Sequence, residues 1–375
     1  MRILFYYESL VLGGQQTQTL NIIREIDESV EVFFAFNQDG EMRPDFEQVS
    51  KVIDLKVPIN SPSLKSMLTT LTRTYFSLSR VIKQHKIDVV ISGSGYGSVI
   101  AGLAARRRGI RHHRFIGCSL IQVEKRLYKY YRKLGIDRLI DKYYGIQAFF
   151  DELRAKGVNE KKLIPFPYGV NTELFTPPSE QERQRKRESL DIPADHTTLG
   201  WIGRVAENMQ ITFTIDLAIE LKKRGFDKFT LVIVGGGSWE QQMLGKIKKN
   251  QLDEQVRYLG WQPMKEVPGF IAAMDIVPLL EEDPRGGSIL REAMSCGKVA
   301  LTVDGASGAQ AEFVFHEKNG ILVGDSNFIS EAADWCIRLH NDRPAMEKIQ
   351  DGARAYVLQE MSHAIQARII ERECQ

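Results

Sequence analysis

The 375-residue chain has few cysteines and no long apolar segment. Its cysteines are scattered, without a CxxC pair or a Cys/His cluster: Cys118, Cys296, Cys336 and Cys374. This pattern argues against a disulfide scaffold or a structural zinc site and fits a reducing compartment. No charge-free apolar run reaches about 20 residues without glycine, so we expect no transmembrane helix. The N-terminal segment meets Glu8 after a handful of apolar residues, so we expect no signal peptide.

The chain also lacks the compositional extremes of disordered or fibrous proteins. Hydrophobic residues make up 43% and charged residues 26% of the sequence, which are ordinary globular values. At roughly 150 residues per domain, the length predicts about two domains with sizeable cores.

The small net charge of +2 hides an asymmetry between the two halves. Residues 1–170 hold 26 Lys and Arg against 17 Asp and Glu, whereas residues 171–375 hold 24 against 31. A basic half and an acidic half suggest two domains with different partners. The basic half could face an anionic membrane, a phosphorylated substrate or nucleic acid, or it could simply be a solvated surface.

Short β-rich runs alternate with helical patterns along the chain. We predict strands at residues 2–7, 30–36, 89–92 and 111–116 in the first half, and at 198–203, 229–234, 256–259, 275–280 and 299–303 in the second. Helices are expected at residues 15–26 and from about residue 330 onward. This alternation predicts an α/β fold of two doubly wound, Rossmann-like domains facing across a cleft, with ligands at the carboxyl ends of the strands.

A proline-containing, highly charged stretch interrupts the pattern and indicates a domain boundary. We predict a first domain over residues 1–172, a linker region over 173–197 and a second domain over 198–357. A last helix at about 358–375 is expected to pack back on the first domain.

Glycine turns follow several predicted strands. Gly13 and Gly14 follow the first strand, and Gly235, Gly236 and Gly237 follow residues 229–234. Such glycines let backbone amides approach an anion at a helix N-terminus, although a plain tight turn is the alternative. Gly203 and Arg204 follow residues 198–203, where the arginine fork would suit a diphosphate; an ordinary surface arginine is the alternative.

The densest candidate segment, EEDPRGGSILREAMSCG, spans residues 281–297. Gly286, Gly287 and Ser288 precede a helix whose exposed N–H groups would form a phosphate-binding site. Glu292 lies about one turn into that helix, where its carboxylate could accept hydrogen bonds from two ribose hydroxyls. An ordinary helix-surface glutamate is the alternative.

These segments together resemble the retaining GT-B glycosyltransferases of family 4. The second half carries WIGR at 201–204, LVIVGGG at 231–237, VRYLGW at 256–261, AAMDIVPLL at 272–280, GGSILREAMSCGKVAL at 286–301 and KNGILV at 318–323. The segments follow the family's order and approximate spacing. The glycine turn at Gly13 and the stretch FPYGVNTELFTP at 166–177 extend the resemblance over nearly the whole chain.

The resemblance implies a nucleotide-sugar donor held mainly by the second domain and an acceptor held mainly by the first. Arg204 would neutralise the diphosphate, Glu292 would bind the ribose, and Gly14 would approach the phosphate or sugar. The other residues that the resemblance assigns to the donor are Gly13, Gly203, Gly235, Gly236, Trp261, Arg285, Gly286, Gly287 and Ser288. The family needs no metal ion and no cofactor; a UDP- or GDP-sugar is the expected co-substrate, and electrostatic preorganisation stabilises the leaving diphosphate.

The sequence departs from the family pattern at three places. Pro284 stands where the first glutamate of an E-x7-E element should be, so Asp283 or Glu282 is the candidate substitute. Met209 stands where a diphosphate lysine is usual, and the loss of that cation removes a contact of roughly 1.5–3 kcal/mol; Arg285 is a possible replacement. The family often places a histidine against the transferred sugar, but the best local register puts Gly117 at that position. His112 and His113 lie in the same region, so His113 is the catalytic candidate, and a structural or surface histidine is the alternative.

A basic and aromatic segment at residues 126–134 suggests a membrane contact. Its cations, together with Lys125, are Arg126, Lys129, Arg132 and Lys133, and tyrosines and leucines lie between them. A basic amphipathic helix of this kind is typical of interfacial membrane binding, and many relatives glycosylate lipid-linked acceptors. A solvated surface is the alternative, and nucleic acid is disfavoured because no recognised binding motif is present.

The sequence therefore supports the hypothesis of a cytoplasmic, peripherally membrane-associated glycosyltransferase. It would move a sugar to a hydroxyl of a glycan or lipid-linked acceptor, in cell-surface polysaccharide, lipopolysaccharide, capsule or glycolipid synthesis. The rival hypothesis, motivated by Met209 and Pro284, is a catalytically silent GT-B protein that binds a partner enzyme or a glycan.

Overall fold

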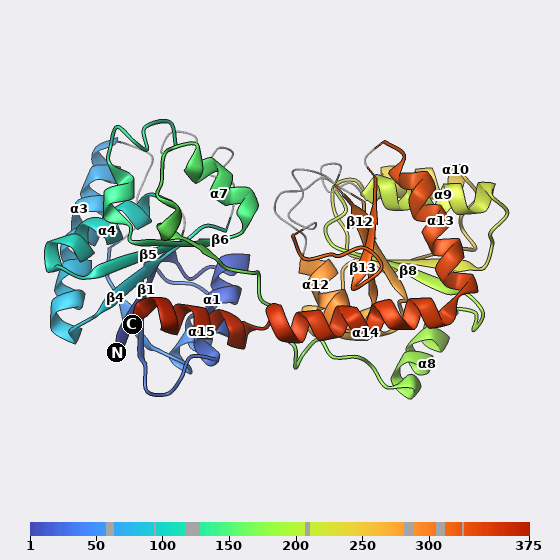
Figure 1. The fold of residues 1–375 in the computed structure, drawn as a ribbon, viewed down its shortest axis with the longest axis horizontal. Helices are drawn as coiled ribbons and strands as arrows, with labels where there is room; N and C mark the ends of the chain where they lie inside the picture. The colour runs from blue at the N-terminus through green and yellow to red at the C-terminus, as the bar shows by residue number, and fades with distance from the viewer. Residues whose placement is uncertain are drawn as a thin grey trace. The chain divides into compact units, whose positions relative to one another are not determined.

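The computed structural model describes residues 1–57, 64–93, 95–117, 128–206, 211–280, 288–304, 312–324 and 326–375 (Figure 1). The chain divides into two compact units. The first unit comprises residues 1–169 and 363–375, and the second comprises residues 170–362. Each unit is built on one parallel β-sheet.

The first unit has a seven-stranded sheet in the order β3-β2-β1-β4-β5-β6-β7, within the described residues. Its strands are β1 (Arg2–Ser9), β2 (Glu31–Gln38), β3 (Lys51–Asp54), β4 (Val89–Ser92), β5 (Arg111–Phe115), β6 (Lys142–Gly145) and β7 (Leu163–Pro165). The central strand β1 is buried from Ile3 to Tyr7 because it is covered on both faces. The four strands predicted in this half are confirmed.

Helices connect these parallel strands, as right-handed crossovers require. They are α1 (Gly14–Arg24), α2 (Arg43–Glu47), α3 (Leu64–His85), α4 (Tyr96–Arg108), α7 (Gln147–Arg154) and the returning C-terminal helix α15 (His363–Cys374), with short 3-10 turns η1 (Ile136–Leu139) and η2 (Glu160–Lys162). Helix α15 packs beside α1 and buries Ala367, Ile370 and Cys374 in the core of this unit. The last segment of the chain is therefore part of the first unit's core.

The second unit has a six-stranded sheet in the order β10-β9-β8-β11-β12-β13, again within the described residues. Its strands are β8 (Thr197–Ile202), β9 (Phe229–Val234), β10 (Val256–Tyr258), β11 (Ile276–Leu279), β12 (Val299–Val303) and β13 (Gly320–Val323). The predicted strands of the second half are confirmed. In both sheets the strand order reverses beside the first strand, between β1 and β4 and between β8 and β11, and ligands of such folds bind at the carboxyl side of that switch point.

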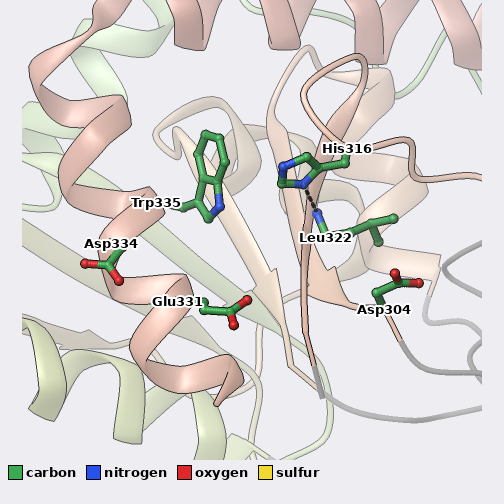
Figure 2. Close-up of a pocket in the computed structure, with 6 residues that line it drawn as sticks. All are labelled: Asp304, His316, Leu322, Glu331, Asp334 and Trp335. Carbon is green, nitrogen blue, oxygen red and sulfur yellow. Dashed lines mark hydrogen bonds between the residues drawn. The ribbon is translucent and has the colours of Figure 1, made fainter. Parts of the chain in front are cut away.

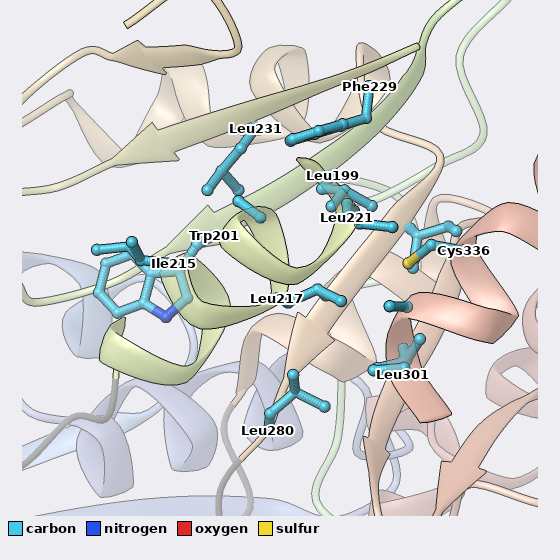
Figure 3. Close-up of a cluster of buried hydrophobic side chains, with 14 of the residues drawn as sticks. Leu199, Trp201, Ile215, Leu217, Leu221, Phe229, Leu231, Leu280, Leu301 and Cys336 are labelled. Atoms are coloured by element: carbon cyan, nitrogen blue, oxygen red, sulfur yellow. The ribbon is translucent and has the colours of Figure 1, made fainter. Parts of the chain in front are cut away.

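The helices of the second unit are α8 (Glu180–Ser189), α9 (Ile211–Lys223), α10 (Glu240–Lys249), α11 (Val267–Ala272), α12 (Ser288–Ser295), α13 (Phe328–Asn341) and α14 (Arg343–Glu360), with the 3-10 turn η4 (Met264–Glu266) before α11. One large apolar cluster packs α9 and α13 against the sheet (Figure 3). Leu199, Leu231 and Leu301, from three different strands, lie at its centre and are fully buried.

The predicted linker over residues 173–197 belongs to the second unit instead. Its charged stretch forms α8, which begins with a capping box between Ser179 and Glu182. Two arginines of α8 reach the carboxylate of Asp275 just before β11: Arg183 at 2.7 Å and Arg187 at 3.3 Å. A carboxylate that is 3% exposed needs such partners, so ion pairs rather than apolar contacts fix this helix to the sheet.

Candidate functional site

The carboxyl end of β8 brings Gly203 and Arg204 to the switch point of the second sheet. The Gly203 amide donates to the Val234 carbonyl at 3.0 Å, and the Val205 amide donates to the Gly236 carbonyl at 3.0 Å. The backbone on both sides of Arg204 is therefore anchored to the neighbouring loop. The Arg204 side chain is exposed and makes no ion pair or hydrogen bond within the described part of the chain. Its guanidinium is available to an anion at this edge.

Close packing of two loops explains the glycines after β9. A Cβ atom at Gly235 would lie 1.8 Å from the Gly203 carbonyl oxygen, and one at Gly237 would lie 2.3 Å from the Val205 carbonyl oxygen. Gly235 also has a φ of +124°, which side chains rarely adopt. The glycines at these two positions are therefore required by the fold itself, whatever ligand lies beyond them.

Gly236 differs from its neighbours because it lies against an exposed aromatic side chain. A Cβ atom at Gly236 would lie 2.8 Å from the indole of Trp261, which follows β10. Trp261 is 69% exposed. Gly236 and Trp261 therefore place an exposed aromatic surface beside the Arg204 loop.

Helix α12 is the next described element after β11, the strand beside β8. Ser288 is exposed at its first position, and Glu292 lies one turn later, half-buried. A side-chain hydrogen bond joins Ser288 to Glu292, and burial raises the pKa of the Glu292 carboxyl group. The helix start and its carboxylate thus share the carboxyl edge with Arg204. The predicted site residues Glu282, Asp283, Arg285, Gly286 and Gly287, and also Pro284 and Met209, lie outside the described residues.

In the first unit the Gly13–Gly14 turn lies at the corresponding switch point. Gly13 has extended backbone before α1, and the Thr17 amide donates to its carbonyl at 3.0 Å. A Cβ atom at Gly14 would meet no atom within 4 Å. This helix start therefore opens to free space, which is what the approach of a ligand requires.

The expectation that His113 takes part in catalysis is not supported. The His113 side chain on β5 is 1% exposed, and its Nδ1 atom lies 2.8 Å from the Tyr144 hydroxyl. His112 is equally buried, between Ser92 and the Leu139 carbonyl. Burial lowers the pKa of His113 to about 3 and that of His112 to about 4, so both imidazoles are neutral. Both are structural groups of the core.

The predicted basic helix over residues 126–134 is also corrected. Within the described part of this segment, residues 128–129 are helical and residues 130–135 form turns that end at Gly135, whose φ is +61°. Lys129, Arg132 and Lys133 are exposed, whereas Tyr131 is buried and bonded to Tyr143. Lys125 and Arg126 fall outside the described residues. Glycine at 135 allows the left-handed conformation that precedes the 3-10 turn η1.

A hollow that the sequence did not predict lies at the β13 edge of the second unit (Figure 2). It has a volume of about 520 Å³ and is lined by Asp304, His316, Leu322, Glu331, Asp334 and Trp335. Its polar groups serve the fold: His316 accepts from the Leu322 amide, Glu331 from the Gly324 amide, and Asp334 pairs with Arg224 at 2.6 Å. No motif joins these residues in sequence.

Two family descriptions match consecutive parts of the chain. Residues 13–169 match "Glycosyl transferase 4-like domain", and residues 182–356 match "Glycosyl transferases group 1". A D-inositol 3-phosphate glycosyltransferase of Corynebacterium jeikeium is 28% identical over 174 residues, which are 45% of this chain and 41% of that protein. The chain therefore spans about two fifths of the length of this relative.

Solved structures of glycosyltransferase type share the whole fold. Anabaena HepE in complex with UDP superposes with a TM-score of 0.81 at 19% identity, over 100% of this chain and 99% of that one. The lipopolysaccharide outer core galactosyltransferase WaaB superposes with a TM-score of 0.73 at 17% identity, over 100% of both chains. From two matching family descriptions and two Rossmann-like parallel-sheet units, we conclude that this chain belongs to the group 1 glycosyltransferases, family 4, with the GT-B fold.

Proposed function

We propose that this protein transfers a sugar from a nucleotide-diphosphate-sugar donor to a hydroxyl of a glycan or lipid-linked acceptor. The observation that carries the proposal is the carboxyl edge of the second sheet, where the exposed Arg204 and the start of α12 flank one switch point. A guanidinium fork and a helix N-terminus are both suited to a diphosphate, and neither has another function in the described structure.

Each group at this edge has a distinct proposed role. Arg204 neutralises the diphosphate as it becomes the leaving group, which lowers the barrier electrostatically. Glu292 accepts hydrogen bonds from the ribose hydroxyls, and the indole of Trp261 lies beside the nucleotide. In the first unit the open turn at Gly14 admits the phosphate or sugar. As the family resemblance implies, the reaction retains anomeric configuration and uses no metal ion or cofactor.

UDP is the favoured nucleotide in this proposal, with GDP as the alternative. The support is that HepE of the same fold was solved with UDP and with UDP-glucose. An inositol phosphate or a lipopolysaccharide core is the acceptor in the names of two similar proteins, so a phosphorylated polyol or a cell-surface glycan is the proposed acceptor class. No described helix has the length and apolar content that crossing a bilayer requires. We propose a cytoplasmic protein that contacts an anionic membrane peripherally.

The first test is a nucleotide panel measured by titration calorimetry or thermal shift. A ligand at 100 times its dissociation constant should stabilise the protein by about 2.7 kcal/mol. We expect UDP to bind. If UDP, GDP, ADP, CMP and their sugar conjugates all fail to bind, the result would contradict the proposal and favour the catalytically silent, partner-binding alternative.

The second test is the variant Glu292→Ala. We expect UDP to bind about tenfold more weakly, because two hydrogen bonds from the ribose to a carboxylate are lost. Glu347→Ala, which removes an exposed carboxylate from α14 of the same unit, is the matched control and should leave binding unchanged. Equal affinity of the Glu292 variant and the control would remove the ribose role.

A further inference from the structure

Helix α3 of the first unit presents two different faces. Its inner face is buried through Thr74, Leu78, Val81 and Ile82, at the spacing of one helical stripe. Its outer face also carries large apolar side chains: Leu68 is 55% exposed and Phe76 is 56% exposed. The outer face therefore carries these large apolar side chains among exposed polar and basic residues, such as Thr72, Arg73 and Arg80.

The neighbouring helix α4 continues this outer face. The two helices pack side by side (Figure 1), and Leu103 of α4 is 41% exposed. Arg107 of α4 donates a hydrogen bond to the Tyr75 hydroxyl at 3.2 Å, and its guanidinium lies 5.9 Å from the centre of that ring. These contacts join the outer faces of α3 and α4 into one surface.

The charge of this surface has a single sign. Nine Lys and Arg residues lie between residues 55 and 108, and the one acid among them is Asp88. The Asp88 carboxylate lies before β4, outside both helices, and accepts from the Arg2 backbone amide at 2.7 Å. The exposed cations Arg73 and Arg80 flank Phe76 on α3. Apolar side chains among cations, without acids, are the signature of a helix that lies in a membrane interface.

We propose that the outer surface of α3 and α4 binds an anionic lipid membrane. We define this α3–α4 face by its exposed residues Leu68, Arg73, Phe76, Arg80, Leu103 and Arg107. The apolar side chains enter the headgroup region while the arginines contact lipid phosphates. The inference rests on the proposed function, which gives the protein a reason to bind a membrane. It adds to that function the residues that make the membrane contact.

The cluster at residues 128–135 is the competing surface in the same unit. It exposes Tyr130 and Leu134 among Lys129, Arg132 and Lys133. It is shorter than α3, however, and consists mostly of turns. Acidic residues at 137, 141, 151 and 152 lie close to it in sequence. The α3–α4 face exposes three large apolar side chains against two in the described part of the cluster, and neither of its helices carries an acid, so it is the better match to an anionic bilayer.

The test is sedimentation of the full chain with vesicles. We expect binding to equimolar phosphatidylglycerol and phosphatidylcholine, and little binding to phosphatidylcholine alone. Each cation near an anionic surface contributes about fivefold in affinity, so Arg73→Glu with Arg80→Glu should weaken binding at least tenfold. Lys248→Glu with Lys249→Glu, on α10 of the second unit, changes the net charge equally and should weaken binding less than twofold. Leu68→Ser with Phe76→Ser should weaken binding at constant charge.

Several results would overturn the inference. These are equal losses in the α3 and α10 charge variants, unchanged binding after Leu68→Ser with Phe76→Ser, or no binding of the unmodified chain to anionic vesicles. A loss caused only by Lys129→Glu, Arg132→Glu and Lys133→Glu would assign the contact to the competing surface. The thermal midpoint of every variant verifies that it folds. UDP titration separates the two proposals, because a chain that binds vesicles but no nucleotide contradicts only the proposed function.

Discussion

The glycine turn after β1 and the glycine loop after β9 look alike in sequence but have different physical causes. A Cβ atom at Gly14 would enter open space, whereas one at Gly235 would overlap the Gly203 carbonyl oxygen at 1.8 Å. The first turn leaves room at a helix start, and the second lets two backbone segments touch. Glycine after a parallel strand therefore does not by itself indicate close backbone packing, which the structure shows at Gly235 and not at Gly14.

The two sheets also differ in the polar groups that they bury. The sheet of the first unit buries two neutral imidazoles, His112 and His113, beside tyrosines, and also the cation Arg114. The sheet of the second unit buries an ionised carboxylate, Asp275, between two arginines of α8. Desolvation raises the pKa of Asp275, but the cations and the Thr198 amide outweigh it and hold that pKa below its usual value. The two units should therefore respond differently to substitution and to pH.

The largest effect is expected for Gly235→Ala. The positive φ and the overlap with Gly203 together should destabilise the second unit by about 3 to 5 kcal/mol. All four tryptophans lie in this unit, so tryptophan fluorescence in urea measures its unfolding. Gly245→Ala on α10, where a Cβ meets nothing within 4 Å, is the control. Equal midpoints for the two variants would show that the loops need not touch.

The variant Asp275→Asn tests the buried ion pairs. It leaves Arg187 buried without its counter-charge, so the second unit should lose about 3 kcal/mol of unfolding free energy. Asp334→Asn removes a carboxylate that is 70% exposed and paired with Arg224, and should cost less than about 1 kcal/mol. Similar losses in both variants would mean that burial adds nothing to the Asp275 pairs.

Acid should destabilise the first unit before the second. The folded pKa values of His112 and His113, about 4 and about 3, lie below the ordinary value of 6.5. At pH values between these folded values and 6.5, the unfolded chain therefore binds more protons than the folded chain. Stability of the first unit should fall as the pH drops from about 6.5 to about 4, by about 2 kcal/mol or more at pH 4.5. Asp275 stays ionised over that range. Far-UV circular dichroism should then show an early transition that tryptophan fluorescence lacks; coincident transitions would contradict this.

The smallest effect on stability is expected for Gly14→Ala. Because a Cβ there meets no neighbour and alanine favours a helix, stability should rise by less than about 1 kcal/mol. Sugar transfer, if the proposed function holds, should fall because the methyl group occupies the approach to the helix start. The thermal midpoint and product formation are measured on one preparation. A drop in the midpoint would show that this turn, like that at Gly235, is packed.

Much of the fold could be predicted because β-branched and aromatic runs form the central strands. β3, β6, β7 and β13 were not predicted, since KVID, KYYG, LIP and GILV are short and carry polar, glycine or proline residues. The charged stretch at 180–189 was mistaken for a linker because ion pairs to Asp275, distant in sequence, hold it. His113 was misassigned because a strand pattern does not show which side of the sheet a neighbouring helix covers. The Arg204 edge could be predicted because it directly follows a recognisable strand.

The return of α15 to the first unit has a consequence for synthesis on the ribosome. Residues 170–362 are synthesised before the segment that buries Ala367, Ile370 and Cys374. The domain that is translated first is thus completed last, and its apolar surface beside α1 stays uncovered while the second domain is synthesised. A C-terminal fusion or a late stop codon should therefore destabilise the N-terminal domain, although that domain lies far away in sequence from the change.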